Sequence, residues 1–139
     1  MTIQAQILDL MAELKDRLGM AVMLITHAMG VVAETAQRVV VMYAGKVVEE
    51  APVRELFAHP RHPYTQGLIR SIPRTDTAAT HKVRLEAIAG TVPKLIEPAA
   101  GCRFAGRCKH VRAECLATTP PLREAAPGHK VACILEQAP

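Results

Sequence analysis

Aromatic side chains are scarce in this sequence of 139 residues, which contains two Tyr, two Phe and no Trp. Proteins that bind single-stranded nucleic acid usually stack the bases on such side chains. The net charge of +4 is modest, and the Lys and Arg residues are spread along the chain without a polybasic run. Both absences argue against nucleic-acid binding, and the shortage of aromatic residues predicts a core of aliphatic side chains.

Long hydrophobic runs are also missing, since no apolar stretch approaches the roughly 18 residues needed to cross a bilayer. The first residues, MTIQAQILDLMAELKDRLG, contain Asp, Glu and Lys and do not have the charged start and apolar centre of a signal peptide. We therefore expect the protein in the cytoplasm. In that compartment the four cysteines are better explained as metal ligands than as two structural disulfides.

The hydrophobic pattern of the first half predicts alternating helices and strands. Apolar residues at helical spacing predict a helix over 3–18 that ends at Gly19. The run MAVMLIT, residues 20–26, has no polar alternation and is typical of a parallel strand covered on both faces. The other predicted elements are a helix at 29–36, a strand at 37–44 that forms a hairpin with KVVEE, a helix at 52–57 and a helix at 64–72.

The character of the sequence changes near residue 73, where polar, turn-rich segments begin. We place a domain boundary there, which gives the parts 1–72 and 73–139. Two apolar strands and one amphipathic helix cannot cover both faces of a sheet. Either the C-terminal part folds back as the cover, or the first part is the second half of a larger α/β domain. We favour the larger domain.

Several segments together resemble one protein family. The segments are TIQAQILDLMAELKDRLGMAVMLITH, VVAE, RVVVMYAGKVVEE, HPRHPYTQGLIRSIP and the cysteine-rich tail. They span essentially the whole chain and resemble the ATP-binding subunits of bacterial ABC importers for oligopeptides, dipeptides and related nickel or glutathione substrates. The resemblance implies an α/β fold in which 1–72 is the C-terminal part of an ABC-type P-loop nucleotide-binding domain. It also implies that 73–139 is a small, irregular extension with a four-cysteine site.

The motifs with which that family binds and cleaves ATP are not in this sequence. It has no G-x-x-x-x-G-K-[ST] P-loop, and it has no glutamine loop, signature loop or acidic strand ending in a catalytic Glu. We therefore predict that the chain alone has no ATPase activity, and we expect the reading frame upstream of Met1 to encode the missing motifs. For a complete relative, the resemblance implies ATP with Mg²⁺ and hydrolysis coupled to the import of di- or oligopeptides.

The resemblance also implies partners and a location. A second, homologous ATPase subunit would sandwich ATP with this one, and the pair would drive two transmembrane permease subunits that accept peptide from an extracytoplasmic binding protein. The subunit would then be peripheral, on the cytoplasmic side of the cell membrane. The rival hypothesis is a free-standing four-cysteine module that binds a metal or an iron–sulfur cluster, serves interaction or redox sensing, and has no nucleotide role.

His27 follows the apolar run 20–26, at the end of a strand where α/β proteins bind their ligands. From its position alone, this histidine could equally cap the next helix or be half-buried at a strand end. The resemblance implies that it is the switch histidine, which contacts the γ-phosphate of ATP and helps to hold the attacking water. In the relatives, the residue after this histidine is usually Asp, whereas in this chain it is Ala28. The chain therefore lacks a partner for the histidine or a cap for the following helix.

The segment HPRHPYTQGLI contains two His-Pro pairs, at His59 and His62. A metal could be imagined on these two histidines, but no carboxylate supports such a site. We prefer a rigid, extended connector whose prolines fix the backbone. In this interpretation Tyr64, Leu68 and Ile69 pack the following helix.

The cysteines have the spacing C-x5-C-x6-C-x17-C. Most zinc ribbons use a C-x2-C pair, which is missing here, and wide gaps suit a cluster whose ligands arrive from separate directions. The Arg and Lys residues between the first three cysteines are expected to lower the thiol pKa values. The resemblance implies a [4Fe–4S] cluster held by Cys102, Cys108, Cys115 and Cys133.

Two alternatives stay open for these cysteines. One is zinc, with His110 able to replace one cysteine, and the other is a set of reduced thiols or incidental disulfides. A cluster at this place would mainly staple a region that is poor in core-forming side chains. Redox regulation of import is the less favoured role.

Overall fold

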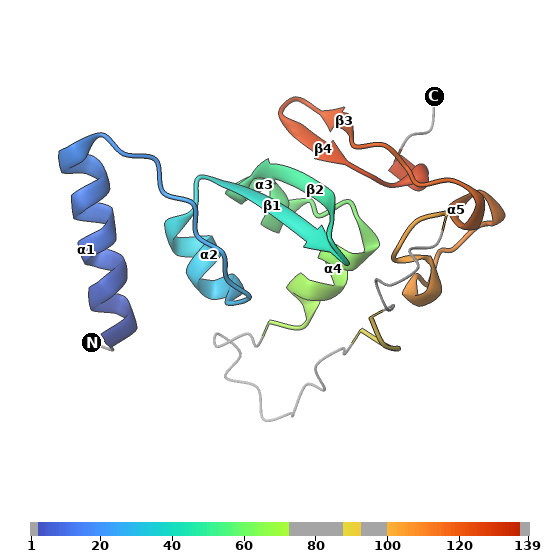
Figure 1. Cartoon of the computed structure of the whole chain (residues 1–139), viewed down its shortest axis with the longest axis horizontal. Helices are drawn as coiled ribbons and strands as arrows, with labels where there is room; N and C mark the ends of the chain where they lie inside the picture. The colour runs from blue at the N-terminus through green and yellow to red at the C-terminus, as the bar shows by residue number, and fades with distance from the viewer. Residues whose placement is uncertain (1–2, 73–87, 93–99, 137–139) are drawn as a thin grey trace. The chain divides into compact units, whose positions relative to one another are not determined.

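A computed structural model of the chain describes residues 3–72, 88–92 and 100–136 (Figure 1). The chain forms two compact units, Met1–Ala36 and Gln37–Pro139. The domain boundary predicted near residue 73 falls at the edge of 73–87, outside the described residues, and stays a prediction. Every helix in the described ranges is too short or too polar to span a bilayer.

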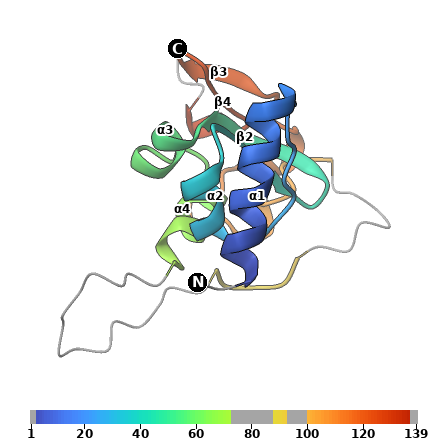
Figure 2. The same cartoon turned by 90° about the vertical axis from the view of Figure 1, so that its left-hand side faces the viewer.

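The first unit contains two helices, α1 (Ile3–Leu18) and α2 (Met29–Thr35), which confirms the helices predicted at these places. α1 runs without interruption over 16 residues (Figure 2). Its apolar side chains recur at helical spacing, yet none of them is buried. Five of them are between 37% and 77% exposed, namely Ile3, Ile7, Leu10, Leu14 and Leu18.

The strand predicted at 20–26 does not form. These residues have no regular structure, and the side chains of Met23 and Ile25 are 88% and 90% exposed. A parallel strand is held by hydrogen bonds to neighbouring strands, and no strand among the described residues pairs with this segment. The prediction of a buried strand is therefore wrong for this structure.

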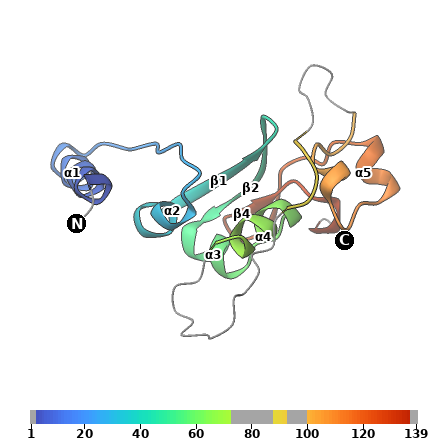
Figure 3. The ribbon, with the colours of Figure 1, turned by 90° about the horizontal axis from the view of Figure 1, so that it is seen from below.

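The second unit contains a four-stranded sheet with the strand order β1-β2-β4-β3. β1 (Arg38–Tyr43) and β2 (Lys46–Pro52) form the antiparallel hairpin that the sequence predicts, and Figure 3 shows it as a long twisted ribbon. The turn residues Ala44 and Gly45 have φ angles of 47° and 77°. A two-residue hairpin turn of this hand requires positive φ at both positions, which glycine adopts without strain.

A second hairpin, made of β3 (Arg123–Ala126) and β4 (His129–Val131), joins the same sheet because β4 pairs with β2. The sheet therefore combines strands from the two sequence parts 1–72 and 73–139. All strand pairs in the described ranges are antiparallel. The second unit is thus a small α/β domain, as the predicted class requires, but the parallel arrangement expected for 1–72 is not found among the described residues.

Two short helices follow β2, namely α3 (Val53–Ala58) and α4 (Pro63–Arg70), close to their predicted positions. Pro63 is the first residue of α4, where the missing N–H of proline would have no partner within the helix anyway. The remaining helical elements are α5 (Ala113–Ala117) and two 3₁₀ turns, Ala105–Arg107 and Ile134–Glu136.

Aromatic rings lie among the aliphatic side chains at the centre of the second unit, so the expectation of an aliphatic core is confirmed only in part. Tyr43 and Phe104 are each 3% exposed, and their ring centroids are 5.1 Å apart with nearly perpendicular planes. Tyr64 packs against both rings, at 4.7 and 5.5 Å. Aromatic pairs with such geometry contribute about 0.5–1.5 kcal/mol beyond the burial of their area. The aliphatic residues of this core are Val41, Val48, Ala51 and Leu56.

Candidate functional site

His27 lies in an exposed bend between the apolar segment 20–26 and α2. The Thr26 hydroxyl next to it accepts a hydrogen bond from the Ala28 N–H at 3.0 Å. Ala28 is the N-cap of α2 and provides no side-chain hydrogen bond to the helix, as the replacement of Asp by Ala predicts. The imidazole is accessible to an external group, and its contact with a γ-phosphate stays a prediction.

The four cysteines line one small cavity in the second unit, and all four are free thiols. Cys115 and Cys133 are each 8% exposed, whereas Cys102 and Cys108 are half-buried. The cavity has a volume of about 20 Å³, which is room for about one water molecule. These residues line the same cavity although they are up to 31 positions apart along the chain.

A close approach of two backbones brings Cys102 next to Cys115. The Cys102 N–H donates a hydrogen bond to the Cys115 carbonyl at 2.7 Å. A side chain at Gly101 would overlap backbone atoms of α5, so only glycine permits this approach. Two 3₁₀-type hydrogen bonds, from Ala105 to Cys102 and from Cys108 to Ala105, then lead the chain to the next cysteine.

Burial raises the pKa of the Cys102 and Cys133 thiols, and hydrogen bonds from nearby backbone N–H groups offset this only in part. Two of the basic side chains between the cysteines, Arg103 and Arg107, are engaged elsewhere. Arg103 donates to a carbonyl in the β1–β2 turn, and Arg107 donates to both carbonyls of 88–89, each at 2.8 Å. The expected lowering of thiol pKa by these cations is therefore wrong for both cysteines.

The structure also overturns the predicted iron–sulfur cluster. Among the residues it describes, no group of three or more His, Cys, Asp or Glu side chains is placed to hold a metal ion. The prediction of a [4Fe–4S] cluster on the four cysteines is wrong, and zinc, with or without His110, finds no support in the same residues.

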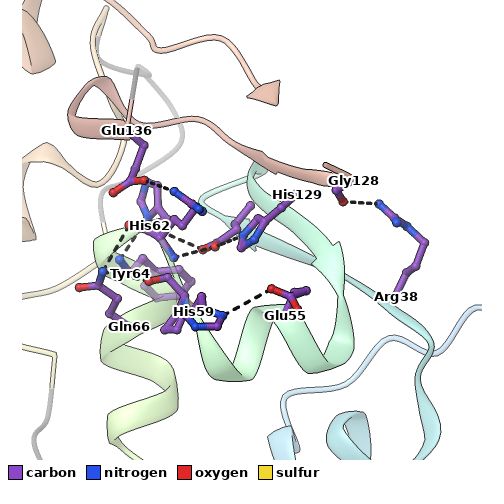
Figure 4. A network of polar contacts seen from close by, with 12 residues as sticks. Arg38, Glu55, His59, His62, Tyr64, Gln66, Gly128, His129 and Glu136 are labelled. Carbon is purple, nitrogen blue, oxygen red and sulfur yellow. Dashed lines mark hydrogen bonds and ion pairs between the residues drawn. The ribbon is translucent and has the colours of Figure 1, made fainter. Parts of the chain in front are cut away.

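A buried carboxylate that no sequence motif singled out ties three parts of the second unit together. Glu49 on β2 is fully buried. Its Oε1 accepts a hydrogen bond from the Arg61 N–H at 2.8 Å and lies 2.7 Å from His129 Nε2 on β4. Its Oε2 accepts a hydrogen bond from the His62 N–H at 2.9 Å. Figure 4 shows His62 and His129 converging on this point from the α3–α4 connector and from β4.

A sequence signal for Glu49 was present. Side chains alternate between the two faces of a strand, so Glu49 shares a face with Ala51, whereas Glu50 lies on the other face. Ala51 is fully buried, which places Glu49 on a covered face. The pattern alone does not reveal the partner, because His129 is 80 positions further along the chain.

Two ion pairs lie near the surface of the second unit, and Figure 4 shows Glu136 of one of them and the contact of Arg38 with Gly128. Arg61 Nη1 lies 2.8 Å from Glu136 Oε2. Arg38 contacts Glu50 at 2.8 Å and also donates to the Gly128 carbonyl at 3.2 Å. The hydrogen bond from Arg38 lowers the pKa of the Glu50 carboxyl, with burial acting against it. Because these pairs are partly exposed, each contributes little to stability compared with a buried pair.

His62 is the N-cap of α4 and is 1% exposed. Its Nδ1 accepts a hydrogen bond from the Tyr64 N–H at 3.1 Å, so in the neutral ring the proton is on Nε2. Burial lowers the pKa of His62 from 6.5 to about 4, and the Glu49 carboxylate opposes this shift only in part. The ring is therefore neutral near pH 7.

These contacts confirm the connector role that we preferred for the His-Pro segment. His62 caps α4, and Tyr64 and Leu68 pack against the core. His59 is largely exposed and contacts Glu55 one helical turn earlier, at 3.4 Å. In the described ranges, neither histidine belongs to a group that could hold a metal.

Comparison with known proteins identifies the relatives of the chain. Residues 48–115 match the family described as "Oligopeptide/dipeptide transporter, C-terminal region". A probable peptide ABC transporter ATP-binding protein of Sinorhizobium fredii is 55% identical over 95% of this chain and 39% of its own length. A putative peptide import ATP-binding protein of Brucella ovis is 52% identical over 96% of this chain and 40% of its own length. The oligopeptide transport ATP-binding protein AppD of Bacillus subtilis is 46% identical, with the same coverage.

The chain thus spans about two fifths of the length of these relatives. The similarity extends over nearly all of the chain, including both structural units. The chain is therefore similar over nearly its whole length to ATP-binding proteins named for peptide ABC transport, and residues 48–115 match the oligopeptide/dipeptide transporter C-terminal region.

Proposed function

We propose that this chain is the C-terminal part of the ATP-binding subunit of an ABC importer for di- or oligopeptides. The observation that carries the proposal is the 46–55% identity to ATP-binding proteins named for peptide transport. The relatives do not support the rival hypothesis of a free-standing four-cysteine module, because the similarity is not confined to the cysteine region.

The first unit supports the proposal through its uncovered apolar surface. The apolar stripe of α1 and the segment 20–25 are exposed in the described structure, and exposed apolar patches of this kind mark interfaces. The relatives are about two and a half times as long as the matched chain. In our proposal, the portion of the subunit that precedes this chain in the relatives covers these apolar side chains. That portion also supplies the strands with which residues 20–26 pair.

In the complete subunit, ATP with Mg²⁺ binds, and His27 contacts the γ-phosphate. A neutral imidazole donates one hydrogen bond from one ring nitrogen and accepts one on the other. It can therefore hold a phosphate oxygen and a water molecule together. The phosphate cradle, the Mg²⁺ ligands and the group that orients the water come from the preceding portion, because phosphoryl transfer needs all of them.

The remaining assignments follow from the same proposal. Residues 1–72 belong to the nucleotide-binding domain, and 73–139 form the C-terminal extension, which the Glu49 contacts fasten to β2 and the His-Pro connector. The subunit pairs with a second ATPase subunit and drives two membrane permeases that receive peptide from an extracytoplasmic binding protein. It is peripheral, on the cytoplasmic face of the membrane.

A chimera tests the proposal. The portion of the Sinorhizobium relative that precedes its matched region is placed ahead of this chain, and Mg²⁺-dependent ATP hydrolysis is measured. We expect turnover by the chimera, none by the chain alone, and a loss of at least about 100-fold in kcat for His27→Ala, the scale of a missing group that orients the attacking water. His59→Ala, which removes another exposed histidine, is the matched control and should leave kcat within about twofold. A folded chimera whose turnover does not change with His27→Ala would contradict the role of His27.

A further inference from the structure

A pocket of about 400 Å³ lies at the turn end of the β1–β2 hairpin. Val41 and Tyr43 belong to the core of the second unit, so Met42 between them points to the opposite face of the sheet. Met42 and its cross-strand partner Val47 both line the pocket. The volume corresponds to about thirteen water molecules and is within the range of roughly 300–1,000 Å³ in which proteins bind small molecules.

The side chains that line this pocket indicate the chemistry of its ligand. Met42, Pro120 and Leu122 provide apolar surface, and Met42 and Leu122 are 56% and 37% exposed. Two cationic side chains, Lys46 and Arg103, also line the pocket, and none of its lining residues in the described ranges is acidic. A ligand with an apolar body and one negatively charged end complements this surface.

Both cationic groups are available to an anion. Arg103 donates a hydrogen bond to the Ala44 carbonyl, which keeps its guanidinium beside Gly45 in the β1–β2 turn. This is the only hydrogen bond that the guanidinium makes to the described part of the chain, and a guanidinium has five N–H donors. Lys46 is exposed, and no described residue forms an ion pair with it. The two side chains can therefore hold a carboxylate at the turn end of the pocket.

The main chain of β2 is open next to the pocket. β4 pairs with β2 over only two residues of each strand, and the last hydrogen bond between these segments runs from the Ala132 N–H to the Val48 carbonyl at 2.8 Å. In a two-residue hairpin turn, the flanking residues Tyr43 and Lys46 exchange their hydrogen bonds. The N–H and C=O of Val47 consequently point away from β1, toward the side where no described strand continues the sheet.

These main-chain groups distinguish a peptide from other apolar carboxylates. A fatty acid would use the apolar surface and the two cations but would leave the Val47 N–H and C=O without partners. A peptide can pair with both groups, as peptides do when they add to the open edge of a sheet. The combination of an apolar pocket, two cations and an open main chain therefore favours a peptide.

We propose that this pocket binds the C-terminal end of a short apolar peptide. The peptide carboxylate contacts Lys46 and Arg103, its last side chains cover Met42 and Leu122, and one of its peptide units forms hydrogen bonds with the main chain of Val47. The N-terminus of the peptide points to solvent, because no acidic residue among those that line the pocket is available to an ammonium group.

This site goes beyond the proposed function, because a subunit that hydrolyses ATP need not bind peptide itself. Binding at this pocket involves neither ATP nor the portion of the subunit that precedes this chain in the relatives. A failure to bind peptide would therefore leave the chimera test of ATP hydrolysis unaffected, and an inactive chimera would leave the peptide site unaffected.

An NMR titration of the ¹⁵N-labelled 139-residue chain tests the site with three probes. The probes are N-acetyl-Leu-Leu with a free carboxylate, the same peptide with a C-terminal amide, and octanoate. We expect saturable shifts of the Lys46 and Val47 N–H signals, with Kd for the free acid at least about tenfold lower than for the amide, because the amide loses the charge-assisted contacts. Octanoate should bind at least about threefold more weakly than the free acid, because it cannot pair with the main chain.

Two exposed lysines on the same sheet provide the variant and its control. Lys46→Gln should raise Kd for the free acid at least about fivefold and reduce the difference between acid and amide, since one of the two cations is lost. Lys130→Gln removes an exposed lysine of β4 that does not line the pocket and should leave Kd within about twofold, as expected for a charge outside the site.

Three results would overturn the proposal. The first is the absence of saturable shifts at Lys46 and Val47 with millimolar N-acetyl-Leu-Leu. The second is an equal Kd for the free acid and the amide, which would show that the cations do not hold the carboxylate. The third is octanoate binding as tightly as the peptide, which would make the pocket a site for simple apolar carboxylates.

Discussion

At the scale of single residues, His62 shows how burial changes a titration. Its pKa falls from 6.5 to about 4 in the folded chain, chiefly because burial disfavours the charged ring. Between these two pH values the unfolded state binds a proton that the folded state does not bind. The stability that the neutral ring provides above pH 6.5 is therefore lost as the pH falls toward 4.

We expect the free energy of unfolding to decrease by about 3 kcal/mol between pH 7 and pH 4 because of His62, since one pKa unit corresponds to about 1.4 kcal/mol. Urea unfolding across this range measures it. His62→Asn keeps an acceptor for the Tyr64 N–H but does not titrate, so its stability should decline less. Parallel pH profiles for the wild-type chain and the variant would count against the buried, neutral histidine.

Glu49 is the second residue on which stability depends. Glu49→Gln replaces a fully buried carboxylate by an amide that cannot accept hydrogen bonds on both of its terminal atoms. We expect a loss of about 2–4 kcal/mol, because a buried donor is left without a partner and the contact with His129 is no longer charge-assisted. Urea unfolding at pH 7 measures this change.

Glu50→Gln is the matched control, one position along β2. Glu50 pairs with Arg38 near the surface, and partly exposed pairs are worth less than about 1 kcal/mol. If the two substitutions lower the free energy of unfolding equally, the burial of Glu49 does not determine how much this residue contributes to stability.

Residues such as Glu49 mark what a single sequence can and cannot predict. A strand is a local property, so KVVEE predicts the second strand of a hairpin. The partners Arg61, His62 and His129 lie 12, 13 and 80 positions away, and no local pattern indicates them. The cysteines show the same limit, because their spacing along the chain does not determine the space between them in the fold.

At the scale of elements, α2 begins without a cap. Ala28 occupies the N-cap position and offers no acceptor to the first N–H groups of the helix. Ala28→Asp should stabilise α2 by about 1 kcal/mol, since an Asp side chain accepts hydrogen bonds from the second or third helical N–H. Hydrogen exchange at Gly30 and Val31 measures the effect, with slower exchange expected.

Ala28→Glu serves as the control for charge, because its longer side chain brings the same charge without the geometry of a good N-cap. If Ala28→Glu slows hydrogen exchange as much as Ala28→Asp does, the effect comes from the interaction of the charge with the helix dipole and not from an N-cap.

The elements that the sequence predicts well are those whose signals are local. α1, α2 and the β1–β2 hairpin follow from helical periodicity and from a Gly at the turn. The aromatic core did not follow from composition, because Tyr43, Tyr64 and Phe104 meet only in three dimensions. The segment 20–26 has the composition of a buried strand, but a strand needs neighbours that composition does not provide.

At the scale of the whole molecule, the two units differ in how completely they bury their apolar residues. The second unit has an aromatic core, a sheet of four strands and a buried polar network. The helices of the first unit contain no buried residue, and the segment 20–25 is exposed. The proposed function explains this difference. In the complete subunit, the preceding portion covers the apolar residues of the first unit, whereas the second unit needs no such partner.

Hydrogen exchange at residues 21–26 tests this explanation most directly, with the chain alone compared to the chimera that carries the preceding portion of the Sinorhizobium relative. Exchange of backbone N–H groups slows strongly when they enter a sheet. The account predicts rapid exchange in the chain alone and slowing by at least about 100-fold in the chimera, while β1 and β2 change little. Equally rapid exchange at 21–26 in both proteins, with the chimera folded, would contradict it.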